Sequence, residues 1–200
     1  MTAEVSRRSM IAGTVGVAGM LPTLANAATE VVKTQTSANG FLIPPDARPP
    51  SFEFAFQIRI ELGERLRYGP TYWGFDRGYV GVLGGTVTGP RFSGKVIPHS
   101  GGDWPTIRPD NSVRFDARYL LQADDGTIVA LHNTGIRHAD KAVLDRMQRY
   151  EHVDPSEYYM GLTPRFEAPE GPHEWLSQTI FVGKADRDKS HSIFTYWALV

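Results

Sequence analysis

Alternating apolar and polar side chains mark residues 51–62 as a strand of a β-sheet. Every second position is apolar, namely Phe52, Phe54, Phe56, Ile58, Ile60 and Leu62. Polar residues fill most of the positions between them. Because successive side chains of a strand point to opposite faces, this period of two predicts one buried face and one solvated face. Such one-sided strands are typical of antiparallel sheets.

The same alternation returns in residues 113–122, the outgoing strand of a predicted hairpin. Its apolar face holds Val113, Phe115, Ala117, Tyr119 and Leu121, and its polar face holds Arg114, Asp116, Arg118 and Gln122. A charged stripe therefore backs an apolar one. The return strand ends at residues 135–138, beyond a tight turn at residues 124–126.

The turn leaves two strand registers open. A two-residue turn pairs Arg118 with Asn133 and Tyr119 with His132, whereas a three-residue turn with a left-handed Gly126 pairs Arg118 with His132. The sequence does not choose between them. In either register these four side chains share one neighbourhood, so we expect Arg118, Tyr119, His132 and Asn133 to contribute to substrate binding.

The remaining pattern predicts a mainly β protein. Further strands are expected at residues 79–88, 92–97, 157–163, 175–184 and 192–200, with a loop at 68–78 and an irregular connection at 164–172. Glycines at positions 81, 84 and 85 indicate bulges in a curling sheet. Residues 140–150 form the only convincing helix, which we expect to cover one end. We therefore predict a closed or nearly closed antiparallel β-barrel of about eight to ten strands with one short helix.

The N-terminal residues have the features of an export signal rather than of a fold. Arg7-Arg8 precedes a weakly apolar run that ends in small residues at Ala25-Asn26-Ala27, which is typical of a twin-arginine (Tat) signal peptide over residues 1–27. Residues 28–50 are predicted to be a Pro-rich tether and residues 51–200 a single β-barrel domain. The apolar run is too short and too glycine-rich for a stable membrane span, so we expect a periplasmic protein.

Composition and charge narrow the function classes. The chain has 200 residues, of which 41% are hydrophobic, and a formal net charge of −1. It lacks the basic surface expected of a nucleic-acid-binding protein. It contains no cysteine, which excludes thiolate nucleophiles, thiolate metal sites and disulfides. The histidines show neither HxH nor HExxH spacing, so we predict no metal site and no cofactor. A homo-oligomer stays open, without a specific pattern to support it.

Two neighbouring positions offer candidate chemistry. Asp103 and Trp104 follow two glycines, where the backbone can turn sharply and present both side chains at a barrel mouth. In a purely structural interpretation, Asp103 caps a turn and Trp104 packs into the core. Arg118 lies two positions from Asp116, which is an ordinary ion pair if exposed. Inside a cavity, the same pair would hold a guanidinium ready for an anionic substrate group.

The end of the return strand offers a proton-transfer group. Histidine is the side chain most easily poised near neutral pH for proton transfer, and we expect Arg137, adjacent to His138, to favour the neutral base. A surface histidine is the plainer interpretation. Tyr158 and Tyr159 face opposite ways in an extended segment, so one of them can line the cavity and polarise an oxygen. The sequence does not decide which one; we take Tyr159 as the catalytic candidate.

Several short blocks occur in an order that resembles the bacterial domain-of-unknown-function family 3237. They are Gly84-Gly85-Thr86, Gly89-Pro90-Arg91, Gly101–Trp104, Asp116–Tyr119, Asp125-Gly126, Gly135–His138, Asp154–Tyr159 and Thr163–Phe166. The resemblance covers residues 51–200 and implies a lipocalin-like antiparallel barrel with an internal cavity. It implies no single established reaction, although it points to small lyases that act on lignin-derived aromatics.

Two functions of different classes follow from these observations. In the first, the barrel is a cofactor-free enzyme, most plausibly a lyase that decarboxylates an aromatic substrate or removes a small carbonyl fragment from it. Arg118 would bind an anionic group, Asp103 or His138 would move the proton, and Tyr119 or Tyr159 would orient the ring. In the second, the same cavity belongs to a periplasmic carrier or sensor of a small apolar ligand.

The export signal gives a first testable prediction. Replacing Arg7 and Arg8 together with Lys should leave the protein in the cytoplasm, because the twin-arginine receptor recognises that pair. Cell fractionation followed by immunoblotting measures the distribution. Periplasmic accumulation equal to that of the parent chain would reject the assignment.

Overall fold

The computed structural model describes residues 35–36, 40, 42–43, 48–149, 151–187 and 191–200. The chain divides into two units, Met1–Arg48 and Pro49–Val200. In the first unit, β1 (Gln35–Thr36) pairs with β2 (Leu42–Ile43) in an antiparallel manner. The predicted signal peptide, residues 1–27, lies outside the described residues. No helix among the described residues is long and apolar enough to cross a membrane.

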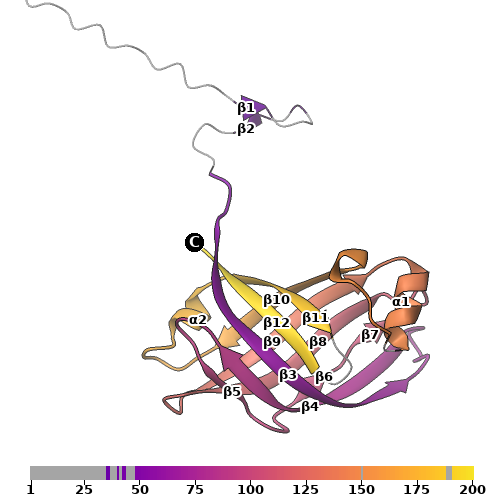
Figure 1. The fold of residues 1–200 in the computed structure, drawn as a ribbon, viewed down its shortest axis with the longest axis horizontal. Helices are drawn as coiled ribbons and strands as arrows, with labels where there is room; N and C mark the ends of the chain where they lie inside the picture. The colour runs from indigo at the N-terminus through magenta and orange to yellow at the C-terminus, as the bar shows by residue number, and fades with distance from the viewer. Residues whose placement is uncertain (1–34, 37–39, 41, 44–47, 150, 188–190) are drawn as a thin grey trace, which may run out of the picture. The chain divides into compact units, whose positions relative to one another are not determined.

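The second unit is a closed antiparallel β-barrel (Figure 1). Its strands are β3 (Phe52–Tyr68), β4 (Asp76–Thr88), β5 (Gly94–Val96), β6 (Gly102–Asp103), β7 (Thr106–Ile107), β8 (Val113–Ala123), β9 (Ile128–His138), β10 (Tyr159–Glu167), β11 (Phe181–Arg187) and β12 (His191–Leu199). Eight of them form the ring, in the order β3, β12, β11, β10, β9, β8, β5 and β4, and β4 pairs again with β3. The short β6 and β7 bridge β4 and β8. The predicted barrel of eight to ten strands is confirmed.

Strand β3 departs from the predicted alternation at two bulges. Tyr196 of β12 pairs with Phe56 and Trp197 with Phe54, so Ala55 is an extra residue, and it is buried. Phe52 and Phe54 consequently face outwards and are about half exposed, which corrects their predicted place on the packed face. A second shift lies between Leu62 and residue 65, beyond which β3 continues to Tyr68. The predicted end at residue 62 was therefore wrong, because the bulge hides the strand's period.

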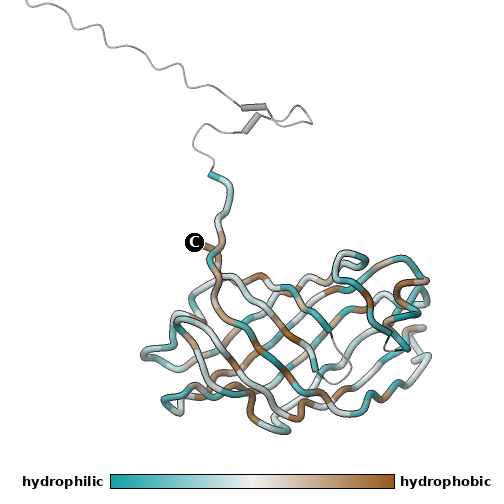
Figure 2. The backbone as a smooth tube through the Cα atoms, in the orientation of Figure 1, coloured by the Kyte–Doolittle hydropathy of each residue, from teal (hydrophilic) through white to brown (hydrophobic). Residues whose placement is uncertain are grey.

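The β8–β9 hairpin settles the register that the sequence left open. Gln122 pairs with Ile128 and Arg118 with His132, so three residues form the turn. Gly126 has φ of +89°, a left-handed conformation that glycine adopts without strain. The three-residue alternative is thus confirmed. Along the barrel strands, hydrophobic and hydrophilic residues alternate as this geometry requires (Figure 2).

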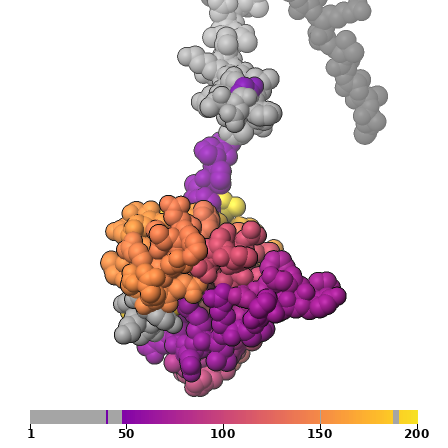
Figure 3. All heavy atoms as spheres, turned by 90° about the vertical axis from the view of Figure 1, so that its right-hand side faces the viewer, coloured from indigo at the N-terminus to yellow at the C-terminus, as the bar shows by residue number. Residues whose placement is uncertain are grey.

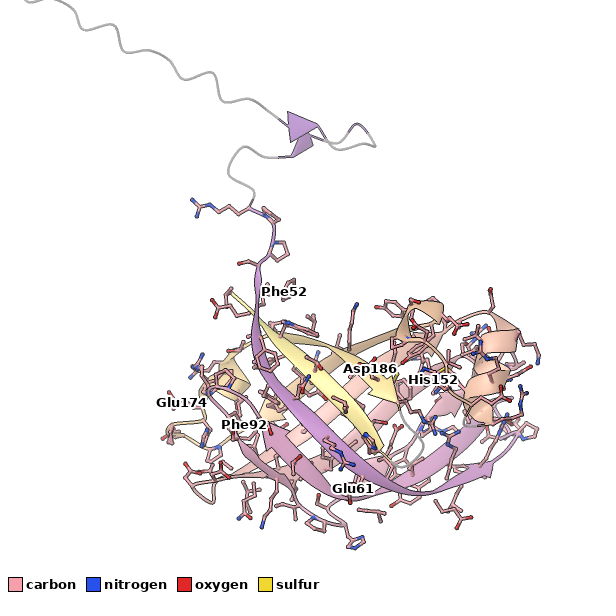
Figure 4. The ribbon with its side chains drawn as sticks, in the orientation of Figure 1. Phe52, Glu61, Phe92, His152, Glu174 and Asp186 are labelled. Carbon is pink, nitrogen blue, oxygen red and sulfur yellow. The ribbon has the colours of Figure 1, made fainter. Side chains whose placement is uncertain are left out.

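Aromatic side chains close one end of the barrel. The Phe56 ring contacts the rings of Phe92, Phe166, Phe181 and Tyr196, with centroid separations of 5.3 to 6.2 Å. The short helix α2 (Trp175–Gln178) packs beside them through Leu176, which is buried. Phe92 marks this end in Figure 4. The strand predicted at 175–184 is thus a helical turn followed by β11, because residues 175–178 pack over the aromatic cluster.

The opposite end of the barrel is covered by α1 (Lys141–Gln148), as predicted (Figure 3). Its buried residues Leu144 and Met147 pack with Val153 and with the half-buried Tyr158. A short 3₁₀ helix, Pro155–Glu157, is held by a capping box in which Asp154 and Glu157 satisfy each other's backbone N–H groups. β10 then runs on to Glu167, through the segment predicted to be irregular.

The packing of the aromatic end predicts that truncating Phe56 destabilises the fold much more than truncating Phe52. Phe56→Ala should lower the free energy of unfolding by roughly 3 to 5 kcal/mol, because it leaves a cavity amid four packed rings. Phe52→Ala in the same strand should cost less than roughly 1 kcal/mol, because that ring is largely solvated. Urea denaturation followed by circular dichroism measures both. Equal losses would contradict the assigned facing of β3.

Candidate functional site

A cavity of about 130 Å³ lies inside the barrel, between the aromatic cluster and the end covered by α1. Most of its wall is apolar and is formed by Ile60, Leu62, Val80, Val82, Ile107, Val113, Phe115, Ala117, Met160, Leu162 and Phe194. An apolar cavity of roughly 150 Å³ is enough to hold a benzene ring. The space therefore suits a ligand built on a single ring.

Strand register brings a row of polar residues into this cavity. Val80 of β4 pairs with Asp103 of β6, which pairs with Ala117 of β8, which in turn pairs with Asn133 of β9. Directly paired residues point to the same face of a sheet. Since Val80 and Ala117 are buried in the barrel interior, Asp103 and Asn133 point inwards as well.

The two glycines before Asp103 allow this arrangement. A Cβ atom on Gly101 would lie 1.8 Å from the carbonyl oxygen of Arg118. On Gly102 it would lie 2.6 Å from the Tyr79 ring and 2.8 Å from the Val80 carbonyl oxygen. Only glycine permits β6 to lie this close to its neighbours. The predicted sharp turn is in fact a short strand, which points Asp103 inwards and Trp104 outwards.

Asp103 is a carboxyl group poised near neutral pH. Its pKa is raised from 3.8 to about 6, chiefly by burial, and the nearby Asp116 carboxylate contributes to this rise. The Asp116 backbone N–H opposes this rise by donating a hydrogen bond to Asp103 Oδ1, at 3.0 Å, and the charges of Arg65 and Arg137 also lower the pKa. Such a group can both give and take a proton at physiological pH.

Arg137 is the buried cation of the cavity. Its side chain is only 3% exposed, and its Nε has no hydrogen-bond partner among the described residues. Burial, together with the nearby charge of Arg65, lowers the pKa of Arg137 to about 10. The guanidinium therefore stays charged at neutral pH. A buried cation with an unused donor is a binding point for an oxygen of a ligand.

Three neutral groups complete the polar part of the cavity region. Asn133 Oδ1 and the Tyr119 and Tyr196 hydroxyls are buried without a hydrogen-bond partner of good geometry among the described residues. Burial raises the pKa of both phenols far above its usual range, so both hydroxyls stay protonated. Tyr119 and Asn133 line the cavity itself. These groups can satisfy hydroxyl or carbonyl oxygens of a bound molecule.

The other predicted candidates lie outside the barrel. Trp104, Arg118 and His132 line a separate groove of about 750 Å³ on the outer face of β8 and β9. There His132 Nε2 lies 2.8 Å from Asp116 Oδ1, and Arg118 Nε lies 3.6 Å from the same oxygen. The Arg118 side chain is 64% exposed. Its predicted place in the cavity is therefore wrong: the apolar stripe of β8 faces inwards and the charged stripe faces water.

His138 and Tyr159 are also on the outside of the barrel. Their rings stack at a centroid separation of 5.0 Å, and both residues are exposed. Tyr158 instead turns inwards against α1, as strand alternation requires. The structure thus brings four of the nine candidates together in the cavity, namely Asp103, Tyr119, Asn133 and Arg137.

Comparison with known proteins agrees with this architecture. Residues 50–199 match the family described as "Protein of unknown function (DUF3237)". The chain belongs to this family. UPF0311 protein RPA1785 of Rhodopseudomonas palustris is 36% identical over 135 residues, which are 68% of this chain and 87% of that protein.

Two solved structures of similar proteins share the fold. The crystal structure of RPA1785 has a TM-score of 0.71 and 31% identity, covering 77% of this chain and 99% of that one. A beta-barrel like protein of Acinetobacter baumannii has a TM-score of 0.67 and 29% identity, covering 78% and 99%.

A more distant similarity is to a fungal enzyme. The hydroalkoxylation enzyme phnH of Penicillium herquei is 33% identical over 78 residues, which are 39% of this chain and 50% of that protein. The structure of an enzyme from the same fungus has a TM-score of 0.58 at 20% identity, covering 79% of this chain and 100% of that one.

Sequence reasoning missed seven polar residues around the cavity of this DUF3237 chain. Six of them line it, namely Arg65, Arg67, Gln148, Arg187, His191 and Ser192, and the hydroxyl of the seventh, Tyr196, is buried in the barrel. Arg187 lies two positions after Ala185 and six after Phe181, both buried in β11, so alternation along the strand could have predicted that Arg187 faces inwards. Among the described residues, no group of three or more His, Asp or Glu side chains is placed to hold a metal ion.

The raised pKa of Asp103 predicts a pH-dependent gain in stability on its removal. The folded chain binds this proton more tightly than the unfolded chain, so the stabilisation is complete below about pH 4 and is lost as the pH rises through about 6. Asp103→Asn should therefore raise the free energy of unfolding at pH 7 by roughly 2 to 3 kcal/mol, and hardly at all at pH 4.

Chemical denaturation at both pH values measures this difference. Asn can still accept the Asp116 N–H bond through its side-chain oxygen, so the local geometry is retained. The matched control is Asp124→Asn, at an exposed turn position, which should change stability little at either pH. A gain of the same size at pH 4 and pH 7 would refute the assigned titration of Asp103.

Proposed function

We propose that this barrel is an acid–base enzyme in which Asp103 transfers a proton to and from a small, mostly apolar substrate. The observation that carries the proposal is a carboxyl with a pKa of about 6 facing an apolar cavity large enough for one ring. Catalytic acids work best when their pKa lies near the working pH. A cavity that only stores an apolar ligand has no need of such a group.

The reaction class we favour is addition of a hydroxyl across a carbon–carbon double bond, or the reverse elimination. The similar protein of Penicillium herquei is named a hydroalkoxylation enzyme, which supports this class. In the addition, the Asp103 proton forms a new C–H bond and the hydroxyl oxygen forms a C–O bond. The hydroxyl proton then passes to the Asp103 carboxylate, which restores the acid. The elimination is the reverse, and no external oxidant or reductant is consumed.

The surroundings of Asp103 suit this cycle. Oδ1 accepts the Asp116 N–H, which leaves Oδ2 as the oxygen that exchanges the proton with substrate. The protonated Tyr119 phenol can donate a hydrogen bond to an oxygen that becomes negative during the reaction. Arg137 supplies a positive charge in a medium of low dielectric constant, where its effect is large. The apolar wall keeps water away from the reacting atoms.

The lyase activity expected from the sequence also depends on acid–base catalysis by proton transfer at carbon. Elimination is a lyase reaction, and decarboxylation or loss of a carbonyl fragment also ends with proton delivery to carbon. The proposal moves the anion-binding role from Arg118 to Arg137, and of the two expected proton-transfer groups it keeps Asp103 and drops His138. A carrier of small apolar ligands is the alternative, and catalytic assays distinguish the two.

Asp103→Asn should abolish turnover while leaving the fold intact. We expect a decrease in kcat of roughly 10²-fold to 10⁴-fold, the usual contribution of a positioned acid or base. In the addition direction, the parent enzyme should lose activity as the pH rises above about 6, because that direction begins with the protonated acid. His138→Gln, outside the barrel, should leave the rate unchanged.

The assay incubates the purified protein in deuterated water with single-ring phenols that carry an alkenyl or cyclic ether side chain. Mass spectrometry then detects deuterium at carbon and conversion between the open and cyclic forms. Ligands that raise the melting temperature without deuterium uptake or conversion would favour the carrier. Activity that depends on His138 and not on Asp103 would move the site to the outer face.

A further inference from the structure

The cavity wall concentrates positive charge in a chain that is slightly acidic overall. Four arginines contribute to it, at positions 65, 67, 137 and 187, whereas Asp103 is its only carboxylate among the described residues. Asp76 pairs with Arg67, since both Nε and Nη2 of Arg67 donate to Asp76 Oδ2. Arginines therefore outnumber carboxylates among the described residues of the wall, whereas the whole sequence has a formal net charge of −1.

Strand register places Arg65 in the same row as Asp103. The bulge in β3 moves the pairing from Leu62 with Val82 to Arg65 with Val80. Val80 is also the partner of Asp103. Arg65 and Asp103 therefore flank one residue of β4 and face the same interior, with Cα atoms roughly 10 Å apart, two strand spacings. The long arginine side chain spans much of that distance.

Arg137 approaches from the other side of the cavity. It pairs with Val113 and Met160, whose side chains also line the cavity wall. Arg65 is near enough to lower the pKa of Arg137, and both arginines lower the pKa of Asp103. Arg137 is buried, and its Nε has no hydrogen-bond partner among the described residues, so an anion beside it gains a charge-assisted hydrogen bond where water is excluded. Arg65 lines the same space.

We infer that the substrate is a single-ring molecule carrying a carboxylate, which binds between Arg65 and Arg137 while its ring lies on the apolar wall. This inference rests on the proposed function and names its substrate class. The carboxylate satisfies the unused Nε–H of Arg137. A hydroxyl on the ring can donate to Asn133 Oδ1, which otherwise has no described partner. A hydroxylated aromatic acid meets both requirements.

The test compares two matched ligands, 4-hydroxybenzoate and 4-hydroxybenzamide, by isothermal titration calorimetry at pH 7. They have nearly the same shape and differ in charge. The carboxylate should bind roughly 10-fold to 100-fold more tightly, as expected for a desolvated ion pair. Its affinity should fall at higher salt, since the attraction is electrostatic. Equal affinities for the two ligands would overturn the inference.

Variants locate the binding site. Arg65→Gln should reduce carboxylate binding roughly 10-fold and leave amide binding unchanged, which also shows that the barrel is folded. Arg114→Gln, on the exposed face of β8, is the matched control and should have no effect. If Arg118→Gln weakens the carboxylate instead, the ligand binds in the outer groove and the inference is wrong.

Asp103→Asn separates this inference from the proposed function. Loss of a negative group from the cavity should preserve or tighten carboxylate binding while turnover disappears. Retained turnover in this variant, with the carboxylate preference intact, would reject only the catalytic role of Asp103. Loss of turnover without any preference for the carboxylate over the amide would reject only the substrate class.

Discussion

Closure of the sheet on itself is the constraint on which the other features of this protein depend. β3 pairs with β12 on one side and with β4 on the other, so every inward side chain shares one interior. An eight-stranded barrel has room for packed side chains or for one small ligand. Here both occur. Large rings around Phe56 fill the end of the barrel at α2, and smaller side chains such as Ala117 and Val80 leave room for the cavity nearer α1.

The fold was predictable because barrel strands repeat their inward and outward positions with a period of two. The same rule identifies most of the site, when applied strictly. Asn133 and Arg137 are polar residues in phase with the apolar face of β9, next to Val129 and Leu131, and both prove to line the cavity. Arg118 is in phase with the charged face of β8, so its alternation already excluded it from the interior.

Bulges account for what periodicity could not predict. An extra residue at Ala55 turns Phe52 and Phe54 outwards, and the shift after Leu62 turns Arg65 inwards. A bulge exchanges the inward and outward faces for every following side chain of the strand. Its presence depends on pairing with strands far away in the sequence. Glycine at position 63 was a weak local sign of it. The inward orientation of Arg65 could therefore not be predicted from the sequence of β3 alone.

Both the cavity and the outer groove contain ionisable groups, but those in the groove are screened by water and those in the cavity are desolvated. In the groove, the side chains of Asp116, His132 and Arg118 are 39 to 64% exposed, so water screens their attraction. In the cavity, desolvation raises the pKa of Asp103, while the Asp116 N–H and two arginines limit that rise. Because burial outweighs these opposing effects, the pKa of Asp103 remains raised, at about 6. Proton transfer requires a group that exists in both forms near the working pH, which is why the proposed function rests on Asp103, inside the barrel.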